Sequence, residues 1–186
     1  VLTTSSGQVM SSKDSGGPWK VALSVPGAKI ATVALAEDGW GVLVTGESAI
    51  WTTVSGGVDW QYLRHVEGSV ARIAVAENHT AWIEVHAGPI WSGHFRAYRV
   101  VNDAWEEIPG QPQLSMIGFV KPDLLIGMDE SGRLMMSTDV GKSWEELSDD
   151  IRNWQDSTKH DPLNCRGAFW SEDARDGWIA CDGRGL

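Results

Sequence analysis

Three segments of this chain, each nineteen residues long, align with one another without gaps. Each contains an apolar run, a polar turn, a second apolar run and a motif of the form Ser/Thr-x-Asp/Ser-x-Gly-x-x-Trp. The segments are VLTTSSGQVMSSKDSGGPW (1–19), VLVTGESAIWTTVSGGVDW (42–60) and IGMDESGRLMMSTDVGKSW (126–144). Because catalytic groups are rarely copied along one chain, the repetition indicates architecture, with each copy forming one structural unit that packs against the next.

The spacing of the repeats predicts the kind of unit. Trp19, Trp60 and Trp144 end the three segments, and Trp105 falls between the last two at a similar spacing. These tryptophans recur at intervals of roughly 40 residues. The intervening apolar runs are short and broken by turn residues, and none shows a sustained helical period. A period near 40 with short strands is typical of the four-stranded blades of a β-propeller. We therefore predict an all-β fold of antiparallel four-stranded blades.

The motif itself resembles a known repeat. The two full copies are Ser12, Asp14, Gly16 and Trp19, and Ser137, Asp139, Gly141 and Trp144, with a weaker copy at Thr53, Ser55, Gly57 and Trp60. They resemble the Asp-box, or BNR, repeats of β-propellers such as sialidases, sortilin-type receptors and xyloglucanases, and the layout is similar to photosystem II assembly-factor-like propellers. The resemblance implies a peripheral hairpin between the third and fourth strands of a blade. There the aspartate would accept backbone N–H bonds and the tryptophan would pack against the sheets, which is a structural role.

The same pattern divides the chain into blades. Residues 1–27 are expected to form the outer three strands of a blade, and 28–66 a complete one. Residues 67–110 form a blade without the motif, 111–148 another complete blade, and 149–186 a long loop followed by the two inner strands of a blade. The second strand of a blade is thus present at both ends of the chain. This duplication favours an incomplete ring, completed by a longer protein or by another copy, over a closed four-bladed ring.

Composition excludes two classes of partner. The formal net charge is −10 and the sequence pI is about 4.8, with lysines and arginines scattered along the chain. An acidic protein without a basic run is not expected to bind nucleic acid. No apolar stretch is long enough to predict a transmembrane segment. The Val1 start suggests a processed or excised segment, and Asn78-His79-Thr80 matches a glycosylation acceptor. We therefore expect a secreted, lumenal or cell-surface location, with the cytoplasm as the alternative.

Ligand binding is expected where the loops of a propeller gather. The resemblance implies that the D–A loops, which join consecutive blades, lie with the B–C loops on one face around the central axis. The longest D–A loop, 147–164, carries polar and aromatic groups that suit a glycan, a peptide or a calcium ion, although a solvated loop would look the same. The candidate binding residues are Asp149, Asp150, Arg152, Trp154 and His160 in this loop, with Asp129, Arg64 and His65 from other loops.

The sequence favours binding over catalysis. A sialidase-like site would need a tyrosine nucleophile and an arginine triad, but the only tyrosines, Tyr62 and Tyr98, are predicted on outer strands. A glycosidase of another type needs two carboxylates that face each other across the channel. Asp129 with Asp150 or Asp182 could form such a pair, but nothing in the sequence distinguishes these aspartates from the other acidic residues. The interpretation is a non-catalytic scaffold that recognises a protein, peptide or glycan and needs no cofactor. The alternatives are a glycoside hydrolase fragment and an assembly factor for a membrane complex.

The two cysteines stand sixteen positions apart, on either side of the last predicted hairpin. If Cys165 and Cys181 face each other across the strand pair, a disulfide between them would add roughly 3 kcal/mol of stability. The alternative is two small buried thiols in a reducing compartment.

Overall fold

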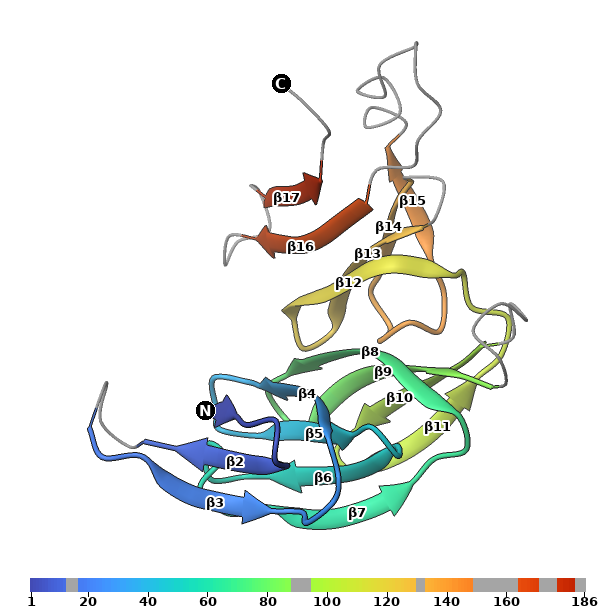
Figure 1. Cartoon of the computed structure of the whole chain (residues 1–186). Helices are drawn as coiled ribbons and strands as arrows, with labels where there is room; N and C mark the ends of the chain where they lie inside the picture. The colour runs from blue at the N-terminus through green and yellow to red at the C-terminus, as the bar shows by residue number, and fades with distance from the viewer. Residues whose placement is uncertain (13–16, 88–94, 130–132, 149–163, 171–176, 183–186) are drawn as a thin grey trace. The chain divides into compact units, whose positions relative to one another are not determined.

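The structure, a computed structural model, describes residues 1–12, 17–87, 95–129, 133–148, 164–170 and 177–182 (Figure 1). Its regular elements are all β-strands, and they group into antiparallel sheets of consecutive strands. Two compact units, Val1–Glu106 and Glu107–Leu186, are described separately below. The predicted all-β architecture of four-stranded antiparallel blades is confirmed.

The first unit contains one sheet of three strands and two sheets of four strands. The N-terminal sheet consists of β1 (Leu2–Thr3), β2 (Gln8–Ser11) and β3 (Lys20–Ser24). The second consists of β4 (Ile30–Leu35), β5 (Gly41–Thr45), β6 (Ala49–Thr53) and β7 (Gln61–His65). The third consists of β8 (Ser69–Ala76), β9 (Thr80–His86), β10 (Phe95–Val101) and β11 (Ala104–Ile108).

Buried side chains on alternating faces of the strands pack between the sheets of this unit. Val42 and Val44 of β5 pack with Ile83 and Val85 of β9 in one core cluster. Leu43, which points to the other face of β5, packs with Val9 of β2 in a second cluster. All five residues of β5 are buried, so the β4–β7 sheet has a core on both faces. This double burial explains why strand β5 reads as a nearly continuous apolar run.

Two hairpins of the third sheet have the backbone geometry that two-residue turns require. Asn78 and His79, between β8 and β9, both have positive φ, as do Asn102 and Asp103, between β10 and β11. Turns with two positive φ angles match the twist of the flanking strands, and asparagine and aspartate adopt this conformation more readily than most residues. The sequence therefore sets these two hairpins locally.

The N-terminal sheet is less buried than its neighbour. Trp19 is 42% exposed and Val21 is 53% exposed, whereas Trp60, which holds the equivalent place in the second repeat, is 9% exposed. Trp60 is enclosed with Val9 and Leu43. Trp19 is thus much less enclosed than the tryptophan of the second repeat.

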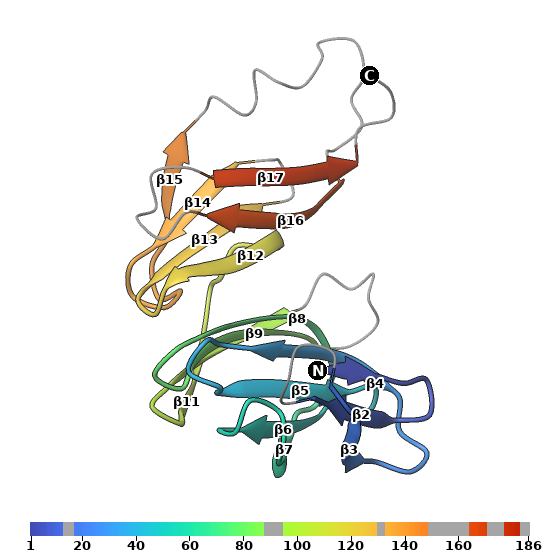
Figure 2. The same ribbon diagram turned by 90° about the vertical axis from the view of Figure 1, so that its left-hand side faces the viewer.

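The second unit contains a four-stranded sheet and a strand pair. The sheet consists of β12 (Leu114–Lys121), β13 (Leu124–Asp129), β14 (Leu134–Ser137) and β15 (Glu145–Ser148). The pair consists of β16 (Asn164–Trp170) and β17 (Gly177–Asp182), and β16 lies alongside β12 (Figure 2). Within the described part of the chain, no helix is long and apolar enough to cross a membrane.

Candidate functional site

The loops of each blade leave its sheet at two opposite ends. In the third sheet the start of β8 meets the end of β9, since Ser69 is the register partner of His86. The D–A loop that precedes β8 and the B–C loop that follows β9 therefore leave the sheet at the same end. We call this the D–A/B–C end, and the opposite end, where the A–B and C–D turns lie, the turn end.

A buried carboxylate lies near the D–A/B–C end of the third sheet. The side chain of Glu84 on β9 is fully buried, and its Oε1 accepts a hydrogen bond from Arg72 Nη1 at 2.5 Å. The Nε2 atom of His86 lies 3.2 Å from the same oxygen. Oε2 has no hydrogen-bond partner among the described residues. Burial raises the pKa of Glu84, and the charge of Arg72 and the contact with His86 offset this only in part.

Several basic residues lie at this end of the second and third sheets. They are Lys29 before β4, Arg64 and His65 at the end of β7, Arg72 on β8, His86 on β9 and Arg96 on β10. Arg64 lies over the ring of Trp105, 5.0 Å from its centroid, which fixes one of these cations on an aromatic face. The exposed acids at the same end are Glu47, Glu67 and Glu107, the next-to-last residue of β11, and Glu84 is a buried one.

The turn end of the same two sheets is acidic. Its charged groups are Glu37, Asp38, Asp59, Glu77 and Asp103, and among the described residues of these turns the only basic side chain is His79. Charge is thus separated along the strand direction, within a chain whose net charge is −10. Such a separation gives the D–A/B–C end a more positive local potential than the composition suggests.

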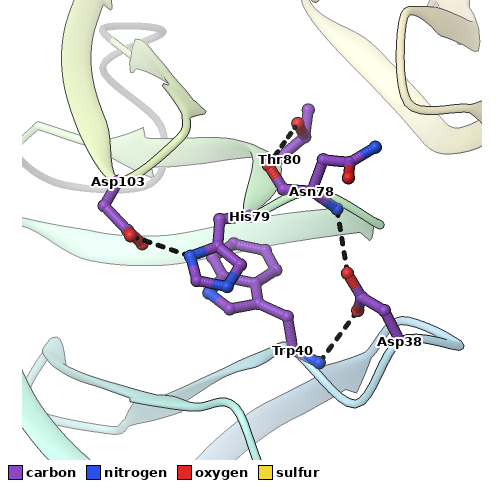
Figure 3. A network of polar contacts seen from close by, with 6 residues as sticks. All are labelled: Asp38, Trp40, Asn78, His79, Thr80 and Asp103. Carbon is purple, nitrogen blue, oxygen red and sulfur yellow. Dashed lines mark hydrogen bonds and ion pairs between the residues drawn. The ribbon is translucent and has the colours of Figure 1, made fainter.

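The acidic turns also join the second sheet to the third (Figure 3). Asp38 accepts hydrogen bonds from the backbone N–H groups of Trp40 and Asn78, both at 2.9 Å, and Asn78 belongs to the neighbouring sheet. The ring of His79 stacks on Trp40 with centroids 5.6 Å apart, and its Nδ1 lies 2.8 Å from Asp103 Oδ2. These contacts give the turn end a structural role.

The turn between β14 and β15 is held by the residues of the third nineteen-residue segment. Ser137 Oγ accepts the backbone N–H of Gly141 at 2.7 Å and donates to Asp139 Oδ1. Asp139 accepts the backbone N–H and the hydroxyl of Ser143 at 2.9 and 2.7 Å. Partial burial raises the pKa of Asp139, but the hydrogen bonds from Ser143 and Ser137 outweigh it and hold the pKa below its ordinary value.

The turn between β6 and β7 has the same plan with a hydroxyl in place of the carboxylate. Thr53 Oγ1 accepts the backbone N–H of Gly57 at 3.2 Å, and Ser55 Oγ accepts that of Asp59 at 2.9 Å. The indole Nε1 of Trp60 donates to the carbonyl of Gly57 at 3.1 Å. Of the first copy, Ser12 and Trp19 are described, whereas Asp14 and Gly16 lie outside the described residues.

A second repeated hydrogen bond was not predicted from the sequence. The fourth residue of each nineteen-residue segment accepts the backbone N–H of the eighth, in the turn between the second and third strands. The pairs are Thr4 with Gln8, Thr45 with Ala49, and Asp129 with Arg133. The Asp129 carboxylate also pairs with the Arg133 guanidinium, with Nε 2.6 Å from Oδ2. The signal was available in the alignment, because a side-chain oxygen occupies the fourth position in every copy.

The structure places only some of the predicted binding residues. Arg64 and His65 lie at the D–A/B–C end, and Asp129 lies in its turn with Arg133. The others, Asp149, Asp150, Arg152, Trp154 and His160, lie outside the described residues. Within the described part, no three His, Cys, Asp or Glu side chains form a group that could hold a metal ion. The calcium alternative concerns the 147–164 loop and stays a prediction.

Arg72 and Glu84 were missed by sequence reasoning, although one signal was present. Glu84 is the one charged residue in the otherwise apolar stretch 81–85. Its link to Arg72 depends on cross-strand register, which a single sequence does not reveal.

Comparisons with known proteins fit this architecture. No family model matches the sequence, and no curated protein matches it. A solved structure of YCF48 from Cyanidioschyzon merolae is similar with a TM-score of 0.63 at 15% identity, covering 96% of this chain and 62% of that one. The fold is that of a β-propeller.

Two further structures show the range of proteins that share this fold. "YCF48 bound to D1 peptide" has a TM-score of 0.63 at 17% identity, over 96% of this chain and 56% of that chain. A GH74 xyloglucanase from Xanthomonas campestris has a TM-score of 0.55 at 15% identity, over 79% of this chain and 28% of that chain. The chain thus spans less than two thirds of the length of these propellers, and the similarity at these identities concerns the fold.

Proposed function

We propose that this propeller is a non-catalytic recognition module that binds an acidic segment of a protein or peptide at its D–A/B–C end. The observation that carries the proposal is that the basic residues of the second and third sheets lie at that end, whereas the turns at the opposite end are acidic. These basic residues are Lys29, Arg64, His65, Arg72, His86 and Arg96. Complementary charge is how an interface orients its partner and raises the rate of encounter.

A similar propeller supports a peptide as the ligand. The structure of YCF48 with a bound D1 peptide is an example of a protein with this fold that binds a peptide. Open loops at one end of a rigid set of sheets also suit peptide recognition, since loops carry specificity while the strands fix their positions. An assembly factor for a membrane complex is one setting in which such a module would act.

The described residues favour binding over hydrolysis. Asp129, which belongs to both of the carboxylate pairs that a glycosidase could use, is 6% exposed as a residue. Its oxygens are occupied by the backbone N–H and the guanidinium of Arg133. A carboxylate that is committed to a turn in this way is poorly placed to protonate a leaving group. The similarity to a xyloglucanase is therefore evidence for a shared fold rather than for glycosidase activity.

Fluorescence anisotropy with a glutamate-rich labelled peptide tests the proposal. We expect the protein to bind this peptide more tightly than its counterpart in which glutamines replace the glutamates. Binding should weaken as salt is raised, because exposed charges are screened. Lys29→Glu should weaken binding, whereas Lys20→Glu, at the start of β3 in another sheet, is the matched control.

Equal affinity for the two peptides, or none for either, would overturn the proposal. A glycan array run on the same sample tests the glycan alternative directly. Release of sugar from xyloglucan or a fluorogenic sialoside would instead establish the hydrolase alternative.

A further inference from the structure

Glu84 occupies a place where the fold itself does not require a carboxylate. The β-bulge between the first two strands of each blade aligns the blades, and the pair that follows it along the first strand is Arg72 with Glu84, Thr32 with Val44, and Met116 with Met128. Glu84 of β9 is therefore equivalent to Val44 of β5 and Met128 of β13. Val44 is fully buried in an apolar cluster, so a blade of this chain forms well with an aliphatic residue there. Glu84 is equally buried, and its Oε2 lacks a partner among the described residues.

A buried carboxylate is costly even when it is paired. Removing a charge from water costs several kcal/mol, and replacing a buried ion pair with apolar side chains is often neutral or stabilising. Stability alone therefore does not account for a carboxylate at this position. Its neighbours give another account, because Glu84 Oε1 holds Arg72 Nη1 at 2.5 Å.

Arg72 is placed to meet a ligand, and Glu84 is placed to hold it there. Arg72 lies on β8, the first strand of its blade, near the D–A/B–C end, and its side chain is 31% exposed. Glu84 lies on β9, between β8 and β10, in a strand whose first six residues are all buried. A rigid acceptor on a buried strand restricts the long arginine side chain before any ligand arrives. Binding then requires less loss of side-chain entropy.

We propose that Glu84 is a positioning residue that fixes the guanidinium of Arg72 for recognition of the acidic ligand. This inference rests on the proposed function for its ligand, but the ordering of Arg72 can be measured without one. His86, whose Nε2 lies 3.2 Å from the same carboxylate oxygen, is a second contact that restrains Glu84.

The test compares Glu84→Leu, which places an aliphatic side chain there as Val44 does in β5, with Glu84→Gln, which keeps a hydrogen-bond acceptor. Glu106→Leu is the matched control, because Glu106 pairs with Arg99 in the same sheet but on β11, outside the cluster. The measurements are the melting temperature, the side-chain NMR signals of Arg72, and the affinity for the glutamate-rich peptide.

We expect Glu84→Leu to fold with a melting temperature at or above that of the wild type, while Arg72 loses its ordered side-chain signals. Affinity for the peptide should fall about threefold to tenfold, the equivalent of ordering one long side chain. Glu84→Gln should recover part of that loss, and Glu106→Leu should bind as the wild type does.

Unchanged Arg72 signals in the Glu84→Leu variant would overturn the inference, and so would wild-type affinity in that variant. If Glu84→Leu fails to fold, Glu84→Gln decides on the same two measurements. If the wild type binds neither peptide, the proposed function fails by itself, and the Arg72 signals alone then decide whether Glu84 positions that side chain.

Discussion

The carboxyl group of Glu84 makes the stability of the first unit depend on pH. Burial raises the pKa of Glu84 in the folded state. At a pH between the unfolded and the folded pKa, the folded protein therefore keeps a proton on Glu84 that the unfolded chain has released. Its contribution to stability is therefore fully present below the unfolded pKa of about 4.3 and is lost as pH rises through the folded pKa. We predict that the wild type loses stability relative to Glu84→Gln over this range.

Thermal unfolding of both variants at a series of pH values measures this difference. Glu106→Gln, which removes an exposed carboxylate paired with Arg99, controls for the change in net charge. A difference between wild type and Glu84→Gln that stays constant with pH would contradict the prediction.

Asp139 has the opposite pH dependence and a substitute already present in the chain. Its folded pKa is lowered, so its contribution is present above the unfolded pKa and is lost as pH falls through the folded pKa. Asp139→Ala should cost roughly 0.5–1.5 kcal/mol in the free energy of unfolding, because the exposed Ser143 N–H exchanges its carboxylate acceptor for water. Asp139→Ser should cost less, since Ser55 accepts the equivalent N–H in the β6–β7 turn.

Urea denaturation near neutral pH measures these changes. A serine variant as unstable as the alanine variant would show that the hydroxyl cannot replace the carboxylate in this turn.

At the scale of the element, the two cysteines lie opposite each other. In the antiparallel pair of β16 and β17, Cys165 is the register partner of Cys181. Directly opposed residues have Cα atoms about 4.5–5.5 Å apart, which is within the range that a disulfide spans. We predict that oxidised glutathione converts the two thiols into one disulfide and releases two molecules of reduced glutathione.

Intact mass spectrometry under non-reducing conditions measures this outcome. The predicted product has lost two hydrogens and carries no glutathione. Cys165→Ser, in which the remaining thiol has no partner, should instead retain one glutathione. Two glutathione adducts on the wild type would contradict the prediction.

The sequence determined the elements more fully than it determined the site. Strands and hairpins follow from local signals such as Asn78-His79 and Asn102-Asp103, whose backbone geometry their own residues favour. The candidate site depends on contacts across strands, such as Arg72 with Glu84, which are twelve positions apart and meet only through the β8–β9 register. The long loop at 147–164 contains many polar residues, but no strand pairing predicts which of them lie close together.

At the scale of the whole molecule, the separation of charge follows from the antiparallel strand order. Successive strands return every A–B and C–D turn to one end of its sheet and every D–A and B–C connection to the other. A few substitutions in turns can therefore change the charge of one end without altering the cores at Val42 and Leu43. This separation of roles is how one repeat can support different ligands on a common scaffold.

The N-terminal sheet gives a prediction about association. Its edge strand β1 has two residues, and Leu2 there is 55% exposed, which leaves an apolar strand edge available for pairing. We predict that this chain associates with itself in a concentration-dependent way through that edge. Leu2→Lys should shift the population toward monomer, because a charge on an edge strand opposes pairing. Leu63→Lys, on the edge strand β7 of a complete sheet, should leave association unchanged. Size-exclusion chromatography with light scattering over a dilution series measures the mass, and a strictly monomeric wild type at every concentration would show that the β1 edge does not mediate association.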